Sequence, residues 1–201
     1  MGMTRQELRD ILNARDPLDF VESQILSRIP WIFSSGATYQ SWLQSVATEL
    51  AIGAENIRIV GSAATGFSLS PLKPGRPFRK ISGPDMRASD IDIALIDRDL
   101  FIGAWNTVVQ FDRLHSLHVP METRDRIRFN VYWGLVDQKS LPRNTAPSRQ
   151  LLTAMAVAGR SPPLRGHFVR CRIYRRIDDL RAYHVVSLGQ LRAKLMEITN
   201  G

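Results

Sequence analysis

The stretches that decide the expected fold are IRIVGS at residues 57–62 and SDIDIALID at residues 89–97. The first is rich in β-branched residues and ends in a Gly-Ser pair, so it predicts a strand that leads into a tight turn. The second alternates apolar residues with aspartates, and this period of two predicts another strand. Asp90 and Asp92 should therefore project from one face of that strand, while the apolar residues face a core on the other side.

These residue types suit a metal ion and a nucleotide. Carboxylate oxygens are the ligands that Mg²⁺ prefers, and the ion shares its shell between a few carboxylates and substrate phosphates. Mn²⁺ is the alternative ion. Gly61 allows the backbone to approach a phosphate, and Ser62 adds a hydroxyl and an N–H. Residues 62–66 can begin a short helix whose free N–H groups face the phosphates, so the two stretches together predict a Mg²⁺–triphosphate site.

The order of these motifs resembles a known family. A strand ending in Gly61-Ser62, then Thr65-Gly66, then a strand beginning Ser-Asp-Ile-Asp is similar to the pattern of the polymerase-β-type nucleotidyltransferase superfamily. The short chain resembles its minimal or toxin-like members. The resemblance implies an α+β, polymerase-β-like nucleotidyltransferase fold with a mixed sheet flanked by helices. It also implies Mg²⁺-dependent transfer of a nucleoside monophosphate from an NTP to a hydroxyl, with release of pyrophosphate.

The same resemblance implies roles for particular residues within residues 57–96. Asp90 and Asp92 would ligate Mg²⁺ and act in catalysis. In a two-metal arrangement, one ion activates the acceptor hydroxyl and the other neutralises the departing pyrophosphate. The nucleotide-binding residues would be Gly61, Ser62, Thr65, Gly66 and Ser89, and the charge of the long loop between the two motifs, a departure from compact family members, adds Lys73 and Arg76.

A third catalytic carboxylate, which the family supplies from a later strand, is less obvious. Asp137, after a strand predicted at residues 126–136, is the candidate, and a structural role in a loop is the alternative. The strand predicted at residues 167–174 carries Arg170 and Arg172 where an acid is expected. The sequence therefore also admits a slow or one-metal transferase, or an inactive nucleotide-binding pseudoenzyme that acts as a sensor or partner subunit.

The arginine-rich strand has two interpretations of its own. Arg170, Arg172 and Tyr174 share one face of the predicted strand. Guanidinium groups in such a row would bind phosphate oxygens in pairs. The same charges would also protect an exposed sheet edge from pairing with another chain.

Positive charge favours a polyanionic partner. The 201 residues include 27 Lys and Arg against 19 Asp and Glu, a formal net charge of +8. This excess favours RNA, DNA or nucleotide phosphates, although a basic surface without a partner fits it as well. The loop at residues 70–88 carries cations that would contact triphosphate or RNA, or that would simply be solvated: Lys73, Arg76, Arg79, Lys80 and Arg87.

The acceptor hydroxyl is predicted from this charge. An RNA 3′ end is the favoured acceptor, and a protein hydroxyl is the next. A purely electrostatic RNA-binding module is a third hypothesis, and it predicts RNA affinity that depends strongly on salt but not on the two aspartates. A protein partner that completes the site is also compatible with the sequence.

The remaining elements follow from helical and strand periodicity. Helices are predicted at residues 4–14, 18–29, 39–50, 100–114, 148–158 and 187–198, and strands at residues 56–60, 90–96, 126–136 and 167–174. Thr4 and Glu7 have the spacing of a capping box at the start of the first helix, and Gly53 is expected to end the third helix. The chain divides into a helical segment at 1–35, a nucleotidyltransferase core at 36–140 and a strand–helix extension at 141–201, all within one structural domain.

Histidine, cysteine and hydropathy exclude several classes. His115 and His118 fit a helix end better than a metal site, and His167 and His184 are expected to be structural or surface residues. The single cysteine, Cys171, allows no internal disulfide. No apolar run approaches the roughly 20 residues that cross a bilayer, and no secretory signal is recognisable. We therefore expect a cytoplasmic protein with no membrane partner.

Overall fold

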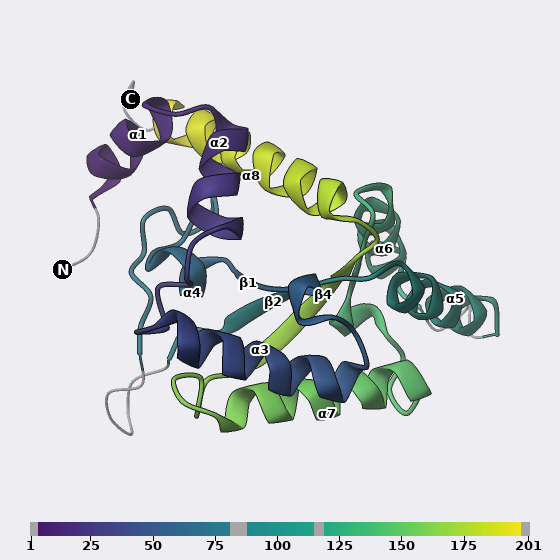
Figure 1. Cartoon of the computed structure of the whole chain (residues 1–201). Helices are drawn as coiled ribbons and strands as arrows, with labels where there is room; N and C mark the ends of the chain where they lie inside the picture. Colours follow the sequence, from purple (N-terminus) through teal and green to yellow (C-terminus); the bar gives the residue numbers. More distant parts are fainter. Residues whose placement is uncertain (1–3, 81–87, 115–118, 198–201) are drawn as a thin grey trace.

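The structure is a computed structural model that describes residues 4–80, 88–114 and 119–197. A four-stranded mixed sheet lies between two layers of helices (Figure 1), which confirms the predicted α+β class with a mixed sheet flanked by helices. The strands in spatial order are β1 (Ile57–Val60), β2 (Ile91–Ile96), β4 (Val169–Tyr174) and β3 (Leu135–Asp137). The strands predicted around β1, β2 and β4 are confirmed.

Strand pairing brings distant parts of the chain together. β1 is antiparallel to β2, β2 is parallel to β4, and β3 is antiparallel to β4. Asp92 is therefore in register with Val60 on one side and with Arg170 on the other. Residues 141–201 supply an inner strand of the sheet as well as helices.

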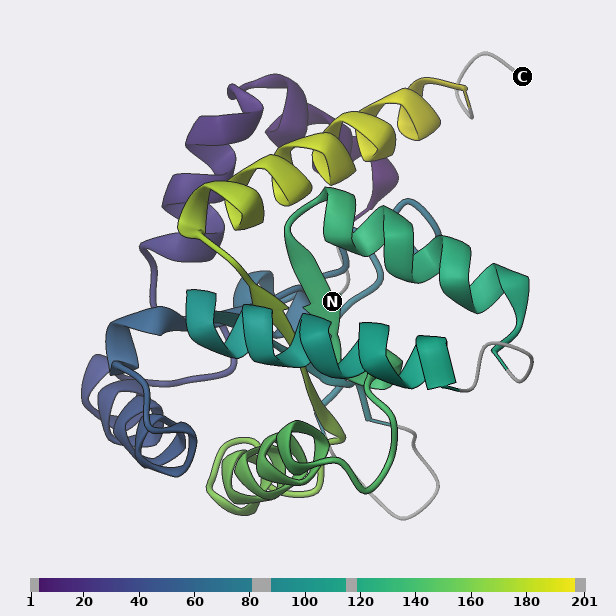
Figure 2. The ribbon, with the colours of Figure 1, turned by 90° about the vertical axis from the view of Figure 1, so that its right-hand side faces the viewer.

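One face of the sheet is sealed by three helices, α3 (Gly36–Leu50), α5 (Arg98–Leu114) and α7 (Ala146–Arg160). Figure 2 shows α3 and α7 together below the sheet. The Trp42 indole N–H donates to the Ala158 carbonyl oxygen at 3.1 Å and ties α3 to α7. The strands contribute fully buried residues to this core, as predicted for the apolar positions of β2: Ile57, Ile59, Ile91, Ile93, Leu95 and Ile173.

The opposite face is covered mainly by α8 (Ile177–Glu197) and the N-terminal helices, seen at the top of Figure 2. These are α1 (Arg5–Asn13), α2 (Pro17–Val21) and the π-helix η1 (Glu22–Leu26). The predicted capping box of α1 is present, since the Thr4 hydroxyl accepts from the Glu7 N–H and the Glu7 carboxylate accepts from the Thr4 N–H. Leucines from α1 and α8 meet Ala94, Leu135 and Tyr174 of the sheet in a second core.

The strand predicted at residues 126–136 is wrong for most of its length. Residues Met121–Tyr132 form the helix α6, and only Leu135–Asp137 pair as β3. Ile127 and Val131 are four residues apart, and both pack against the main core, whereas the intervening Phe129 is exposed. Arginines between apolar residues mimic the period of a strand, but the packed pair has the spacing of a helix.

Smaller differences concern helix ends. The second predicted helix is divided into α2 and η1, and α8 begins ten residues before the predicted start at Ser187. α3 ends at Leu50, and its C-cap Ala51 adopts the left-handed conformation expected of Gly53, while Gly53 precedes the 3₁₀ helix η2 (Ala54–Asn56). His115, His118 and Arg87 lie outside the described residues. Among the helices described, none has the length and apolarity that a membrane crossing requires.

Candidate active site

A cavity of about 720 Å³ lies on the sheet face that α8 covers only in part. Its volume is in the range of small-molecule sites. The floor comprises the end of β1 and the adjoining parts of β2 and β4: Gly61, Ser62, Ser89, Asp90, Asp92, Arg170 and Arg172. The loop after β1 forms one wall and α8 forms another. Seven of the residues predicted to bind metal or nucleotide therefore line this one cavity: Gly61, Ser62, Lys73, Arg76, Ser89, Asp90 and Asp92.

Gly61 makes the turn that brings the chain against the acidic pair. Its φ of +66° and ψ of −151° belong to a region that only glycine adopts without strain. A Cβ atom built at this position would lie 3.1 Å from Oδ2 of Asp92. The glycine thus serves both the backbone turn and the close approach of β1 to β2. The short helix α4 (Ser62–Thr65) follows immediately.

Thr65 and Gly66 lie behind this turn and support it. Thr65 is buried, and its hydroxyl donates to the Phe67 carbonyl oxygen at 2.7 Å. Gly66 has a φ of +88°, and a Cβ atom there would lie 2.9 Å from Cδ1 of Trp31. The structure therefore places these two predicted nucleotide-binding residues under the loop, apart from the residues that line the cavity.

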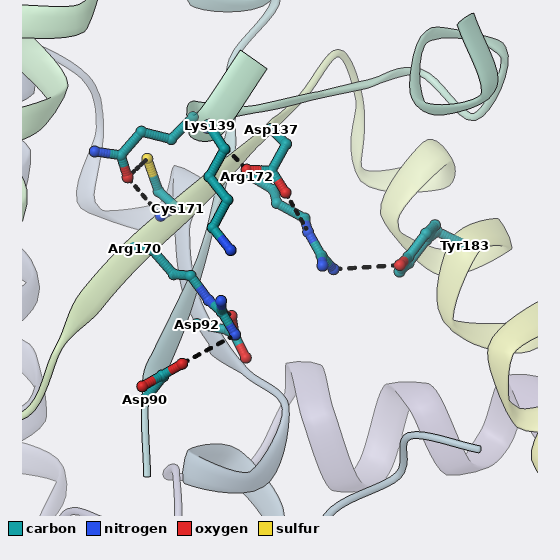
Figure 3. Close-up of polar contacts among 9 residues, drawn as sticks. Asp90, Asp92, Asp137, Lys139, Arg170, Cys171, Arg172 and Tyr183 are labelled. Carbon is teal, nitrogen blue, oxygen red and sulfur yellow. Dashed lines mark hydrogen bonds and ion pairs between the residues drawn. The ribbon is translucent and has the colours of Figure 1, made fainter. Parts of the chain in front are cut away.

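The two predicted metal ligands are held by an arginine (Figure 3). Arg170 Nε donates to Oδ1 of Asp92 at 2.7 Å, and its Nη2 lies 3.4 Å from Oδ2 of Asp90. Because Arg170 is in register with Asp92 on the neighbouring parallel strand, the sheet itself determines this pairing. A cation thus stands where the third carboxylate is expected.

Asp137 lies on the far side of β4 from the acidic pair. Its Oδ1 accepts from the Lys139 N–H at 2.9 Å and so caps the turn η4 (Gln138–Ser140), while Oδ2 lies 3.5 Å from Arg172 Nε. Arg172 also donates to the Tyr183 hydroxyl at 3.2 Å. Burial lowers the pKa of Arg172, but Tyr183, Tyr174, Asp92 and Asp137 together outweigh it and raise the pKa. Arg172 therefore remains charged, and β4 separates Asp137 from the predicted metal ligands.

The basic loop is folded against the site. Backbone hydrogen bonds join Ser68 N–H to Arg76 O at 2.8 Å and Phe78 N–H to Gly66 O at 2.8 Å. The exposed cations Lys73, Arg76 and Arg79 line the cavity. Lys80 points elsewhere, with its Nζ 4.8 Å from the centre of the Trp31 ring. The base of the loop is tied to the segment just before β2, because the Ser89 hydroxyl accepts from the Arg79 N–H at 3.0 Å.

One wall of the cavity was not predicted from the sequence. It consists of polar residues at helical spacing on α8: Tyr183, His184, Ser187 and Gln190. The Nε2 atom of His184 is buried and has no hydrogen-bond partner within the described parts of the chain. Burial and the nearby Arg172 lower the pKa of His184 to about 4, so this imidazole is neutral at physiological pH. A polar stripe with intervals of three and four residues was the signal for this wall, but the predicted helix began at Ser187.

The donor set fits one divalent ion. Asp90 and Asp92 line the cavity and offer hard oxygen ligands, and a Mg²⁺ ion completes its shell with water or phosphate oxygens. In the described ranges, no group of three or more His, Cys, Asp or Glu side chains is arranged to hold a metal. The position beside Asp92 that a further ligand would take is occupied by the Arg170 guanidinium. The arrangement thus fits one ion and does not fit a two-metal site of three carboxylates.

Comparisons of this chain with protein-family models, with curated proteins and with solved structures gave no match. The functional conclusion therefore depends on the geometry of the cavity and on the motif resemblance in the sequence.

Proposed function

We propose that this protein is a Mg²⁺-dependent nucleotidyltransferase of polymerase-β-like fold. It transfers a nucleoside monophosphate from an NTP to a hydroxyl acceptor and releases pyrophosphate. The observation that carries the proposal is the convergence of the Gly61-Ser62 turn, the Asp90–Asp92 pair and the loop cations on one cavity. These groups come from separate segments, and each suits one part of a metal–triphosphate complex.

Each group of residues in the cavity would have a separate role in this reaction. Asp90 and Asp92 would hold one Mg²⁺ or Mn²⁺, which supplies positive charge for the phosphates and the leaving pyrophosphate. The Gly61 turn lets the backbone approach the triphosphate, and Ser62 offers a hydroxyl next to it. Lys73 and Arg76 add positive charge from the loop. Rate acceleration would come from positioning and charge neutralisation, as in other phosphoryl-transfer enzymes.

The acceptor belongs to the same proposal. An RNA 3′ end is favoured because the chain carries a net charge of +8 and several of its cations line the cavity. A protein hydroxyl is the next candidate. A cytoplasmic location, where NTPs and RNA are both available, is part of this proposal.

A second function, nucleotide binding without transfer, is favoured by one observation. Arg170 contacts both predicted metal ligands and stands where the family's third carboxylate is expected. A pseudoenzyme of this kind would bind nucleotide as a sensor or partner subunit. It differs from the transferase in releasing no pyrophosphate with any acceptor.

The test is transfer of label from each of the four α-labelled NTPs to total cellular RNA and protein, with Mg²⁺. The wild type is compared with the Asp90→Asn/Asp92→Asn double variant and with Asp99→Asn, a matched change at an exposed aspartate on α5. We expect transfer by the wild type and by Asp99→Asn, and at least about a hundredfold less by the double variant. Full transfer by a folded double variant overturns the proposal. Calorimetric binding of Mg²⁺–NTP by the wild type, without transfer to either extract, identifies the pseudoenzyme instead.

A further inference from the structure

Arg170 contacts the same oxygen atoms that a divalent ion would use. Its Nε is 2.7 Å from Oδ1 of Asp92, and its Nη2 is 3.4 Å from Oδ2 of Asp90. The backbone of Arg170 is held in register with Asp92 of β2, and β4 also pairs with β3 from Arg172 to Tyr174, so any rearrangement falls mainly to the Arg170 side chain. An ion that binds to the two carboxylates must therefore compete with the guanidinium group.

The exposure of this cluster permits such competition. The side chains of Arg170, Asp90 and Asp92 are 30%, 32% and 31% exposed. Ion pairs that water reaches are weak compared with buried ones, because solvent screens them and hydrates the separated charges. A divalent ion, with twice the charge of a guanidinium, can displace the arginine without leaving an unsolvated charge behind.

The displaced guanidinium would remain in the cavity. Arg170 lines it together with the loop residues Lys73, Arg76 and Arg79. A guanidinium presents paired N–H groups that match two oxygens of a phosphate. Arg172, two positions along β4, is less able to take this role because it is bound to Tyr183 and lies near Asp137.

We propose that Arg170 is the built-in cation of a one-ion site, and that it exchanges the Asp90–Asp92 pair for a triphosphate when a divalent ion binds. Without an ion, Arg170 holds the two carboxylates together against their mutual repulsion. With an ion, it becomes a triphosphate ligand. Metal and triphosphate then strengthen each other's binding, because the ion releases the arginine that the triphosphate uses. This inference rests on the proposed function.

Binding measurements test the exchange without any need for turnover. Mn²⁺ affinity is measured by electron paramagnetic resonance, and affinity for inorganic tripolyphosphate by calorimetry with and without Mn²⁺, so that no base preference need be known. The key variant is Arg170→Gln. Arg175→Gln is the matched control, because Arg175 forms a similar ion pair with Asp179 just beyond the other end of β4, where Arg176 still pairs with the aspartate.

Two opposite changes are expected in Arg170→Gln. Mn²⁺ alone should bind at least about fivefold more tightly, and tripolyphosphate with Mn²⁺ at least about fivefold more weakly, relative to both the wild type and Arg175→Gln. Arg170→Lys keeps the charge but lacks the paired N–H groups, so it should show the weaker tripolyphosphate binding. It also serves as the test if Arg170→Gln does not fold.

The outcomes separate this inference from the function on which it rests. If the wild type binds tripolyphosphate with Mn²⁺ but the Arg170 variants lack the expected changes, the exchange is overturned and the nucleotidyltransferase proposal stands. If the wild type binds neither tripolyphosphate nor any NTP in the presence of Mn²⁺, both are overturned.

Discussion

The two faces of β2 differ in nearly every physical respect although their residues alternate along six positions. Ile91, Ile93 and Leu95 are at most 1% exposed and lie in the core beneath α3, α5 and α7. Asp92, between the two isoleucines, is about one-third exposed and lines the cavity with its neighbour Asp90. One strand thus supplies buried core residues from one side and charged cavity residues from the other. The rigid, dry side fixes the backbone on which the charged side chains are placed.

The charged face itself is divided in a second way. Ala94, Leu135 and Tyr174 lie on the same side of the sheet as Asp92 but are fully buried beneath α8 and the N-terminal helices. The division arises because α8 seals one part of this face and forms only a wall at the other. An open cavity therefore lies next to a closed core on the same face of the sheet.

The largest effect on stability is expected on the buried face of β2. Ile93→Ala removes three carbons from a closed core and should lower the free energy of unfolding by about 2–5 kcal/mol. Chemical denaturation measures it. Ile102→Ala, at a residue of α5 that is 40% exposed, is the control and should change stability by no more than about 0.5 kcal/mol. Equal losses in the two variants would contradict the division between the faces.

The next largest effect is expected at the Gly61 turn, where the backbone after β1 approaches Asp92 on the charged face of β2. Gly61→Ala forces a Cβ atom into a glycine-only conformation 3.1 Å from Asp92 Oδ2. Unfolding free energy should fall by about 1–3 kcal/mol, and Mn²⁺ affinity should also change because Asp92 must move.

The control for this variant is another glycine. Gly103→Ala lies in α5 with nothing within 4 Å of the added Cβ atom, and it should stabilise the protein by up to about 1 kcal/mol. If Gly61→Ala is as harmless as Gly103→Ala in denaturation and Mn²⁺ binding, the close approach of β1 to Asp92 is wrong.

A smaller effect concerns pH and the wall that α8 supplies. The pKa of His184 is lowered from 6.5 to about 4 in the folded protein by burial and by Arg172. Below pH 6.5 the unfolded chain binds a proton that the folded protein does not, so stability is lost as the pH falls from 6.5 towards 4. Because His184 as a whole residue is partly exposed, which reduces the effect, we expect a loss of about 1 kcal/mol between pH 7 and pH 5 from this residue.

Denaturation at several pH values checks the assignment to His184. His184→Asn removes the titrating group, so its stability should fall less between pH 7 and pH 5 than that of the wild type. An unchanged dependence on pH in this variant would show that other groups cause the loss.

The smallest effect is expected at the solvent-facing rim. Lys73→Gln/Arg76→Gln removes two exposed cations from the loop wall and should weaken tripolyphosphate binding by about threefold to tenfold, with a shallower dependence on salt. Stability should be unaffected. The control is Arg143→Gln/Arg165→Gln, which removes the same charge at exposed positions apart from the cavity lining. Equal weakening of tripolyphosphate binding in both double variants would show that the loop cations act only through the overall charge of the protein.

Local patterns predicted much of this architecture. The alternation in β2, the β-branched run of β1 and the capping box of α1 each depend on neighbours in the sequence, and each is confirmed. The closeness of Gly61 and Asp92 could also be predicted from the sequence, because pairing of the two strands brings the end of one beside the start of the other. The strand prediction for residues 126–136 was wrong because a period of two and a helical spacing coexist there, and tertiary packing decides between them.

The features missed are those that depend on long-range register. Arg170 and Asp92 are 78 positions apart, and nothing in either local sequence indicates that β4 lies beside β2. The same is true of Asp137, which the strand order places beyond β4. Predicting the polar wall of α8 would have required knowing where that helix begins and which face it turns to the cavity.

The position of β4 has a consequence for how the protein is made. β4 is the last of the four described strands to leave the ribosome, yet it lies inside the sheet, between β2 and β3. Until residue 174 has emerged, β2 has one open edge and β3 has no partner strand, so the nascent chain exposes hydrogen-bonding edges of the kind that invite misassembly. Since most pairings with β4 join segments far apart in the chain, folding should be slow for a protein of this size. The pairing of β4 with β2 therefore both closes this part of the sheet and brings Arg170 beside Asp92.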